Sequence, residues 1–254
     1  MNDKAKELSI GISMPVLNEF DSIKQILTEI ATELKSENYT ICIIDDGSND
    51  GTLNIIEELM SQNKRIKLIK RVKKRYGCQR GAASRRALEW LIINTRHTVF
   101  VEMDADGSQP PTELINGAKQ VFMLDYDIAI ASRFISDSKV IGRPLVRRFV
   151  SRFYSLLARL LFNSRIHDYS HCYRFYTREA AKFLLNFKPR YTSPIYLLEI
   201  LVIWIANNYR VIEIPTLYIE RNDKQSKVKF VDLIKGFFGI LDIAFKYHRK
   251  FYSR

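Results

Sequence analysis

Short apolar runs alternate along the first half of the chain with segments in which apolar residues recur every three or four positions. The short runs are rich in β-branched residues, as strands are: SIGISM (9–14), TICIID (40–45), IKLI (66–69), TVFVEM (98–103) and DIAIAS (127–132). The helix-period segments cover residues 23–34, 52–61, 82–94 and 112–123. This alternation predicts an α/β fold with a mostly parallel central sheet.

Two longer segments in the second half of the chain have an amphipathic helical pattern. Within residues 143–162, one face carries Val146, Phe149, Val150, Phe153, Leu157 and Leu160, and the opposite face carries Arg148, Arg152 and Arg159. Near the C-terminus, an apolar stripe is followed by basic residues: Ile234, Phe237, Phe238, Leu241 and Phe245, then Lys246, Arg249, Lys250 and Arg254. We therefore expect one domain over residues 1–230, which includes the helix 143–162, followed by a basic amphipathic helix over 231–254.

No segment has the roughly 20 consecutive apolar residues that a membrane-spanning helix needs. The most apolar run, residues 195–206, predicts a buried helix in which the Glu199 carboxylate needs a polar partner. The N-terminus lacks the apolar core and cleavage site of a secretory signal. Three scattered cysteines, Cys42, Cys78 and Cys172, fit a reducing compartment. We therefore expect a cytosolic protein whose cysteines are mostly buried.

The chain carries 40 Lys and Arg residues against 28 Asp and Glu residues, which gives a formal net charge of +12 at pH 7. This excess predicts an anionic partner: nucleic acid, phosphate groups or a lipid surface. The basic residues alternate with apolar ones on helices and accompany no recognisable nucleic-acid-binding motif, which disfavours a nucleic-acid-binding module. An arginine stripe opposite large apolar residues is typical of a helix that lies in a membrane interface, although a core helix with a solvated back has the same pattern.

Two carboxylates, Asp104 and Asp106, follow the apolar strand 98–103 and precede the turn formers Gly107 and Pro110. Residues spaced i and i+2 in an extended segment point to one side, so the two carboxylates come close together. Such hard oxygen donors suit Mg²⁺ or Mn²⁺, which commonly takes one or two carboxylates from protein. A solvated turn has the same short pattern, so the carboxylate pair alone does not distinguish a metal site from a solvated turn.

Two other predicted strands end in polar turns, PVLNE at 15–19 and DDGSNDGT at 45–52. Ligands of open parallel sheets bind beyond the carboxyl ends of the strands. Asp45 and Asp46 can accept hydrogen bonds from a base or a ribose, and the glycines permit tight turns. The same letters also make a good loop and helix start.

Together, these three motifs resemble, in order and spacing, the family-2 inverting glycosyltransferases of the GT-A fold. The segments DADGSQPP (104–111), ASRF (131–134), HDYSHCYRFY (167–176) and IEIPTLYIERNDKQSKV (212–228) are similar to those of the dolichol-phosphate mannosyltransferase and polyprenyl-phosphate glycosyltransferase branch. The resemblance covers residues 8 to 230. It implies a Rossmann-like nucleotide-sugar-binding fold. It also implies metal-dependent transfer of a sugar from GDP-mannose or a UDP-hexose to polyprenyl or dolichyl phosphate.

The resemblance also implies the roles of single residues. On the donor side, Pro15, Glu19, Asp45 and Asp46 would line the nucleoside pocket, and Asp104, Asp106 and Ser108 would hold the Mg²⁺ or Mn²⁺. Arg133, which matches a basic residue near the phosphates, and Arg174, which matches the arginine that ends a later family segment, would be catalytic. Further substrate-binding positions are Asp168, Ser170, Glu199, Arg221, Ser226 and Lys227.

The chain departs from the family pattern in three places. The usual Thr-Ser-Gly of the family reads Ser170-His171-Cys172, which adds bulk to the pocket for the sugar or the acceptor. The family's Gly-rich loop appears as RYGCQRG at 75–81, and Gln225 replaces a glycine. Because of these changes, the chain could instead be a catalytically silent partner subunit. The retained Asp104 and Asp106 argue against this alternative.

A lipid phosphate is ionised at neutral pH, so transfer to it needs no general base, while metal and arginines stabilise the departing nucleoside diphosphate. The alternative is a glycosyltransferase that acts on a sugar hydroxyl, for which Asp168 or Glu199 would have to serve as the base. For lipid-phosphate transfer we expect a peripheral protein on the cytoplasmic side of a membrane. Because many relatives append transmembrane helices, a membrane-anchoring partner subunit is a further expected partner.

Overall fold

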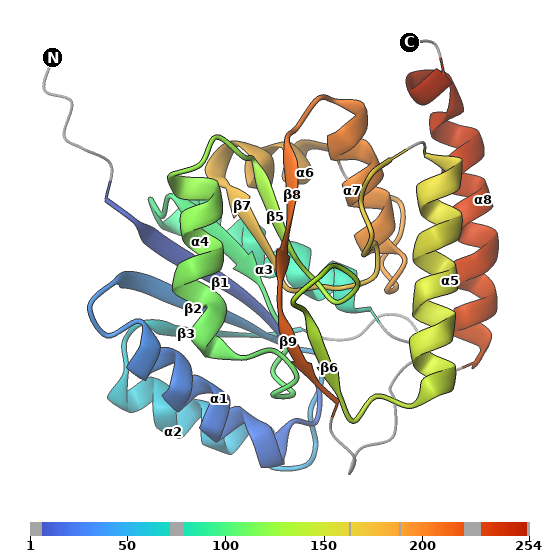
Figure 1. Cartoon of the computed structure of the whole chain (residues 1–254). Coiled ribbons are helices and arrows are strands. Elements are labelled where there is room, and N and C mark those ends of the chain that lie inside the picture. Colours follow the sequence, from blue (N-terminus) through green and yellow to red (C-terminus); the bar gives the residue numbers. More distant parts are fainter. Residues whose placement is uncertain (1–6, 72–78, 163, 188, 221–229, 253–254) are drawn as a thin grey trace, which may run out of the picture.

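Seven strands form the central sheet of a computed structural model, which describes residues 7–71, 79–162, 164–187, 189–220 and 230–252. The strand order is β3-β2-β1-β4-β7-β5-β8. The strands are β1 (Ser9–Val16), β2 (Asn38–Asp45), β3 (Ile66–Lys70), β4 (Val99–Glu102), β5 (Ile128–Ser132), β7 (Arg174–Thr177) and β8 (Val211–Pro215). A separate parallel pair joins β6 (Lys139–Ile141) to β9 (Leu217–Ile219). The predicted α/β fold with its mostly parallel sheet is confirmed (Figure 1).

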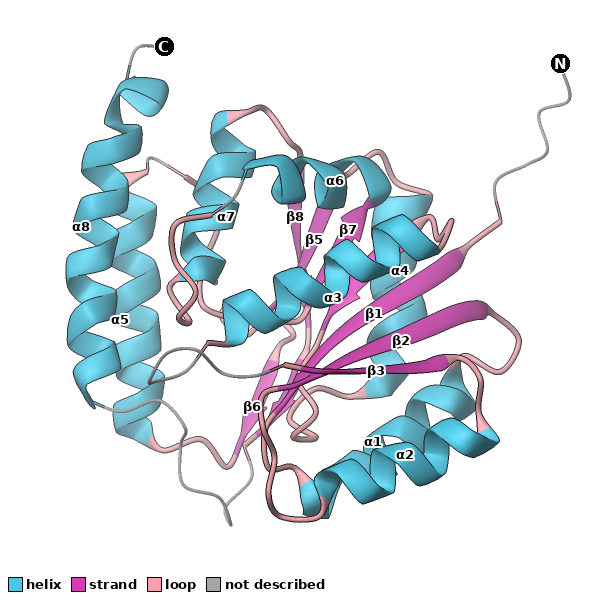
Figure 2. Cartoon of the chain, turned by 180° about the vertical axis from the view of Figure 1, so that it is seen from behind, coloured by secondary structure: helices cyan, strands magenta, loops and turns pink. Residues whose placement is uncertain are grey.

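Helices cover both faces of this sheet (Figure 2). One face packs against α1 (Phe20–Glu33), α2 (Thr52–Gln62) and α4 (Leu114–Phe122), the last preceded by the short helix η1 (Pro111–Glu113). The other face packs against α3 (Arg80–Asn94), α6 (Arg178–Phe187) and α7 (Tyr196–Ala206). The long helices α5 (Leu145–Leu161) and α8 (Phe230–Tyr252) lie side by side at one end of the molecule. Every helix and strand expected from the sequence is present.

Alternation along each strand divides the core into two clusters. In β2, Ile41 and Ile43 pack on the side of α1, whereas Cys42 and Ile44 pack on the side of α3. Strands covered on both faces must be apolar throughout, which explains the unbroken apolar runs in the sequence. Ile240 of α8 belongs to the α3 cluster, so the C-terminal helix shares the core of the chain.

The sheet has one strand, β7, that runs antiparallel to both of its neighbours, β4 and β5. Its four residues, RFYT, are too few to show an alternation, and the sequence analysis did not predict it. β7 begins two residues after Ser170-His171-Cys172, the segment that differs from the family's Thr-Ser-Gly. Because β7 pairs with β4, residues 170–172 lie near the end of β4, where Asp104 and Asp106 follow.

The carboxyl ends of β1, β2 and β4 meet at one edge of the sheet. Val16 pairs with Asp45, and Ser13 pairs with Glu102, two residues before Asp104. The turn after β2 needs glycine, because Gly47 and Gly51 both adopt a φ of +93°, a region that side chains disfavour. The three motifs separated in sequence therefore surround one surface.

Candidate active site

Asp104 and Asp106 lie together just beyond β4. Burial raises the pKa of Asp106, and the negative charges of Asp104 and of Glu19 raise it further. Ser108 partly offsets this, since its backbone N–H donates to Asp106 Oδ1 at 2.9 Å and its side chain also hydrogen-bonds the carboxylate. Three carboxylates within electrostatic range of one another favour the binding of a cation.

Asp104 is held in place through both of its oxygens. Its Oδ1 accepts a hydrogen bond from Arg80 Nε at 2.7 Å, and its Oδ2 accepts one from the Cys172 thiol at 2.9 Å. Gln109 Oε1 accepts the backbone N–H of Asp104 at 2.9 Å. Burial is the largest single effect and would raise the pKa of Asp104. The charge and hydrogen bond of Arg80 and the hydrogen bond of Cys172 together outweigh burial and lower the pKa, so the carboxylate is ionised.

The donor set of this cluster fits a hard divalent cation. Asp104, Asp106 and Ser108 offer carboxylate and hydroxyl oxygens, the ligands that Mg²⁺ and Mn²⁺ prefer. Within the described residues, no group of three or more His, Cys, Asp or Glu side chains is arranged around a metal position. The protein would therefore supply a partial set and leave positions for water and phosphate oxygens, as is usual for Mg²⁺.

The residues expected around the nucleoside occupy the adjacent turns of β1 and β2. Asp45 is buried and accepts backbone N–H groups of Gly47 and Ser48 at 2.9 and 3.1 Å, which fixes the turn. Pro15 pairs with Ile44 in the sheet. Glu19 is also buried, and its backbone N–H donates to Thr52 Oγ1 at 2.9 Å. The structure brings this group together beside the carboxylate cluster.

Asp46 has a partner that sequence analysis missed. Arg71 donates from Nε to Asp46 Oδ1 and from Nη2 to Oδ2, both at 2.7 Å. Such a bidentate pair fixes the geometry of both side chains. One sequence signal could have indicated this ion pair: Arg71 directly follows β3, the parallel neighbour of β2. A run of basic residues by itself suggests only a solvated surface.

Arg133 and Asp168 form a buried ion pair on the opposite side of the cluster. Arg133 donates from Nε to Asp168 Oδ2 at 2.8 Å and from Nη2 to Oδ1 at 2.9 Å. Its Nη2 also donates to Ser170 Oγ at 2.7 Å. Burial would raise the pKa of Asp168, but the Arg133 charge and the hydrogen bonds that Arg133 donates together outweigh burial and hold this pKa well below its usual range. These three predicted site residues therefore act as one unit.

Arg174 lies deeper than its expected catalytic role requires. It is fully buried and donates to the carbonyl oxygens of His171 at 2.8 Å, Leu197 at 2.7 Å and Tyr169 at 3.0 Å. A guanidinium whose donors point at backbone oxygens is a support for the chain around it. Arg174 is therefore positioned to hold the segment 169–171, and its catalytic role stays a prediction.

Glu199 is buried within α7, and its Oε2 accepts the Tyr191 backbone N–H at 2.9 Å, which supplies the expected polar partner. Nine of the eleven residues of α7 are buried, as its sequence predicted. The remaining predicted positions, Arg221, Ser226 and Lys227, lie outside the described residues, as does Cys78.

His171, one of the family departures, is almost completely buried next to Arg133 and Asp104. Its Nδ1 faces the Ala131 carbonyl oxygen, which requires a proton on Nδ1 and leaves Nε2 as an acceptor. Burial, reinforced by Arg133, lowers the pKa of His171 to about 3, so the ring is neutral. Tyr218 packs edge-on against this ring at 5.5 Å.

An arginine cluster, defined as Arg133, Arg143 and Arg147, lies beside the carboxylates. The guanidinium groups of Arg133 and Arg143 stack on the Tyr218 ring at 5.4 and 5.2 Å. Arg147 pairs with Glu220 at 2.6 Å. Tyr218 lies within electrostatic range of both Asp106 and Arg143, and Arg143 immediately precedes α5. The cluster thus connects the carboxylates to the start of α5.

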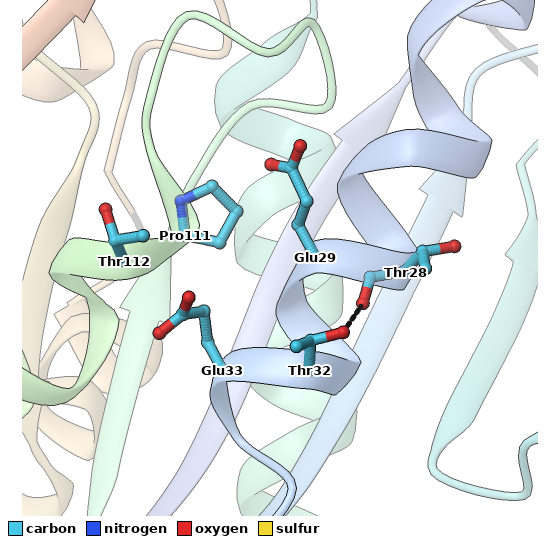
Figure 3. Close-up of a pocket in the computed structure, with 6 residues that line it drawn as sticks. All are labelled: Thr28, Glu29, Thr32, Glu33, Pro111 and Thr112. Carbon is cyan, nitrogen blue, oxygen red and sulfur yellow. Dashed lines mark hydrogen bonds between the residues drawn. The ribbon is translucent and has the colours of Figure 1, made fainter.

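A separate hollow of about 150 Å³ lies between α1 and η1 (Figure 3). Its lining residues are Thr28, Glu29, Thr32, Glu33, Pro111 and Thr112. Two glutamates without a basic residue would repel a phosphate, so this hollow does not suit an anionic ligand.

Comparison with known proteins identifies similar chains. A family model described as glycosyl transferase family 2 matches residues 12–185. The polyprenol monophosphomannose synthase of Mycolicibacterium smegmatis is 29% identical over 237 residues, which cover 91% of this chain and 85% of that protein. The dolichol-phosphate mannosyltransferase of Pyrococcus furiosus is 30% identical over 153 residues, which cover 60% of this chain and 41% of that protein.

A solved structure shares the fold. Glucosyl-3-phosphoglycerate synthase from Mycobacterium tuberculosis in complex with uridine diphosphate superimposes with a TM-score of 0.68, although only 15% of the aligned residues are identical. The match covers 93% of this chain and 80% of that one. Other crystals of the same synthase contain Mn²⁺ or Mg²⁺ together with uridine diphosphate.

Proposed function

Since the chain belongs to glycosyl transferase family 2, we propose that it transfers a sugar from a nucleotide sugar to polyprenyl or dolichyl phosphate at a membrane surface. The names of its two curated relatives, a polyprenol monophosphomannose synthase and a dolichol-phosphate mannosyltransferase, support this acceptor class. Within the structure, the observation that carries the proposal is the arginine cluster between the carboxylate pair and α5.

On the donor side, Asp104, Asp106 and Ser108 would hold Mg²⁺ or Mn²⁺ against the diphosphate. The cation would neutralise the charge that develops on the departing nucleoside diphosphate. The rigid turns around Glu19, Asp45 and Asp46 would bind the nucleoside, because they lie at the same edge of the sheet. This arrangement fits either GDP or UDP as the leaving group.

On the acceptor side, a phosphate oxygen would be the nucleophile. It is already ionised, so the site must attract and orient it but need not remove a proton. Arg143 is suited to this task, since its Nε and Nη1 have no hydrogen-bond partner among the described residues and its nearest carboxylate, Glu220, lies 3.9 Å from Nε. Asp168 is already engaged by Arg133, and its lowered pKa makes it a poor base. These contacts favour a lipid phosphate over a sugar hydroxyl as the acceptor.

Large apolar side chains are exposed along α5 and α8, two helices that lie side by side in both views. We define this exposed apolar surface as Leu145, Val146, Phe149, Phe153, Leu156, Leu160, Phe237, Phe238, Leu241 and Phe245. Phe149 is 71% exposed and Phe245 90% exposed, and large exposed apolar patches mark binding surfaces. No helix among the described residues is long and apolar enough to cross a membrane. Peripheral binding through this surface would bring a lipid phosphate to the cluster.

Replacing both Phe149 and Phe153 with serine should weaken binding to anionic vesicles at least roughly tenfold, because each phenylalanine loses its transfer from water into lipid. Co-sedimentation with vesicles of phosphatidylcholine and phosphatidylglycerol measures this effect. The matched control replaces Ile93 of α3 and Met123, which directly follows α4, with serine; these side chains are 72% and 70% exposed. Equal losses in the two double variants would contradict a binding role specific to α5.

The proposed reaction can be tested by incubating the protein with Mg²⁺ or Mn²⁺, undecaprenyl or dolichyl phosphate, and radiolabelled GDP- and UDP-sugars. Label should enter the lipid extract with at least one donor and should depend on the divalent cation. Failure with every common donor would contradict the proposal. A location on the cytoplasmic side and a membrane-anchoring partner subunit stay predictions.

A further inference from the structure

Cys172 stands where the family pattern has a glycine, two residues before β7. It is a free cysteine and is almost completely buried. Its Sγ lies 2.9 Å from Asp104 Oδ2 and 2.8 Å from Gln109 Nε2. A glycine could make neither contact. The replacement therefore adds a polar group directly beside a carboxylate that is expected to bind the cation.

The chemistry of the three residues fixes the direction of these hydrogen bonds. The Asp104 backbone N–H can only donate, so the Gln109 atom that faces it at 2.9 Å is the amide oxygen. The amide nitrogen of Gln109 consequently faces Cys172 Sγ and donates to it. The thiol proton goes to Asp104 Oδ2, because an ionised carboxylate only accepts. Asp104, Gln109 and Cys172 thus form a closed ring of hydrogen bonds.

This ring fixes the Asp104 side chain relative to its own backbone. Cys172 holds Oδ2, while Arg80 Nε holds Oδ1 at 2.7 Å. The Asp104 side chain is nevertheless 28% exposed, so a cation can reach its remaining lone pairs. With a glycine at position 172, the side-chain contact of Oδ2 within the ring would be Gln109 Nε2, which is 3.5 Å away. Hydrogen-bond partners behind a metal ligand orient that ligand, and their removal weakens metal binding.

The backbone around Cys172 is held by contacts that do not involve its sulfur. Arg174 Nε donates to the His171 carbonyl oxygen at 2.8 Å. The Ala131 backbone N–H donates to the Tyr173 carbonyl oxygen at 3.0 Å. β7, which begins at Arg174, pairs with both β4 and β5. Anchoring of this segment therefore does not account for the thiol contacts, and a smaller side chain at position 172 should leave the segment in place.

We propose that Cys172 is a positioning residue for the divalent cation, whose thiol holds the Asp104 carboxylate ready to bind Mg²⁺ or Mn²⁺. The inference rests on the proposed function, in which Asp104 is a metal ligand, and adds a support for that ligand. The sulfur stays behind the carboxylate, so the protein offers the cation only oxygen ligands, which Mg²⁺ and Mn²⁺ prefer. The replacement of the family's glycine then supports the metal site instead of disabling it.

The test measures Mn²⁺ binding by the full chain from the electron paramagnetic resonance signal of free Mn²⁺. The metal is titrated alone and then with GDP or UDP, and titrations of the nucleotide without protein are subtracted. Cys172→Ala should weaken Mn²⁺ binding about tenfold, the lower end of the range for a lost partner of a metal ligand, because a thiol is a weak donor. Cys172→Ser restores a donor at nearly the same place, so its affinity should lie within about threefold of the wild type.

The matched control is Cys42→Ala, since Cys42 is a fully buried cysteine of β2. The same loss of volume there should leave Mn²⁺ binding unchanged. Equal Mn²⁺ affinity of Cys172→Ala and the wild type would exclude the proposed role, and an equal loss in Cys42→Ala would assign the effect to the stability of the fold.

An equal loss in Cys172→Ala and Cys172→Ser would also overturn the inference. Tighter binding of Cd²⁺ than of Mn²⁺ by the wild type would then identify the sulfur as a direct metal ligand. Absence of Mn²⁺ binding by the wild type, with and without nucleotide, would overturn the proposed function as well, which separates the two failures.

Discussion

Asp106→Asn should lower the rate of sugar transfer roughly a thousandfold, the scale of several kcal/mol that a metal ion contributes to stabilising charge in a transition state. The carboxylate carries a raised pKa because it is buried and faces Asp104 and Glu19. Asparagine is nearly isosteric but neutral, so it removes the metal ligand and the repulsion together. We therefore expect the melting temperature to be unchanged or higher while activity is lost.

Steady-state transfer assays and thermal unfolding of the same preparations check this prediction. The control is Asp125→Asn, since Asp125 is an exposed carboxylate paired with Arg210 away from the site. Retention of a tenth or more of the activity by Asp106→Asn would contradict its role as a metal ligand. A large fall in melting temperature would instead mean that Asp106 is a structural carboxylate.

Asp168→Ala should lower the free energy of unfolding by about 3–5 kcal/mol, because it leaves the buried Arg133 guanidinium unpaired. Removing both charges at once, in Arg133→Met with Asp168→Leu, should cost less than the single change, since no isolated charge stays buried. Urea unfolding of Arg133→Met, Asp168→Leu and the double variant gives the coupling energy. Additive losses would show that the two side chains do not interact.

The same ion pair makes a pH prediction. The pKa of Asp168 is lower in the folded protein than in the unfolded chain, where an aspartate titrates near about 3.9. The pair therefore stabilises the fold fully above that value, and its contribution is lost as the pH falls toward the folded pKa. The unfolding free energy of the wild type should decrease more steeply below about pH 4 than that of Asp168→Asn. Parallel curves would contradict this assignment.

The sequence predicted the parallel part of the sheet because buried strands are continuously apolar and end in polar turns. The positions of the polar turns at the strand ends were enough to place Asp45 and Asp104 at the same edge of the sheet. It did not predict β7, since a four-residue strand acquires its identity from its pairing with β4 and β5. The contacts made by Arg71 and Arg80 depend on long-range packing, so the sequence pattern assigned a contact to neither arginine.

The helix α5 shows a second limit of sequence patterns. Its period predicted the helix, and Phe149, Phe153 and Leu160 are exposed on it. However, Val150 and Leu157, which were expected on the same face, are half-buried. Packing in the folded chain decides which part of an apolar stripe is covered, and a helical period contains no information about that packing. Arg174 was likewise expected to be catalytic, and its motif could not reveal the three carbonyl groups that its guanidinium contacts.

The nature of the nucleophile can be tested most directly with two acceptors of equal chain length, polyprenyl phosphate and polyprenol, offered with the same labelled nucleotide sugar and Mg²⁺. An ionised phosphate needs no base, whereas an alcohol does, and base catalysis is worth about a hundredfold or more. We expect transfer to polyprenyl phosphate to be at least about a hundredfold faster. Equal rates with the two acceptors, or transfer to the alcohol alone, would contradict a site built for a lipid phosphate.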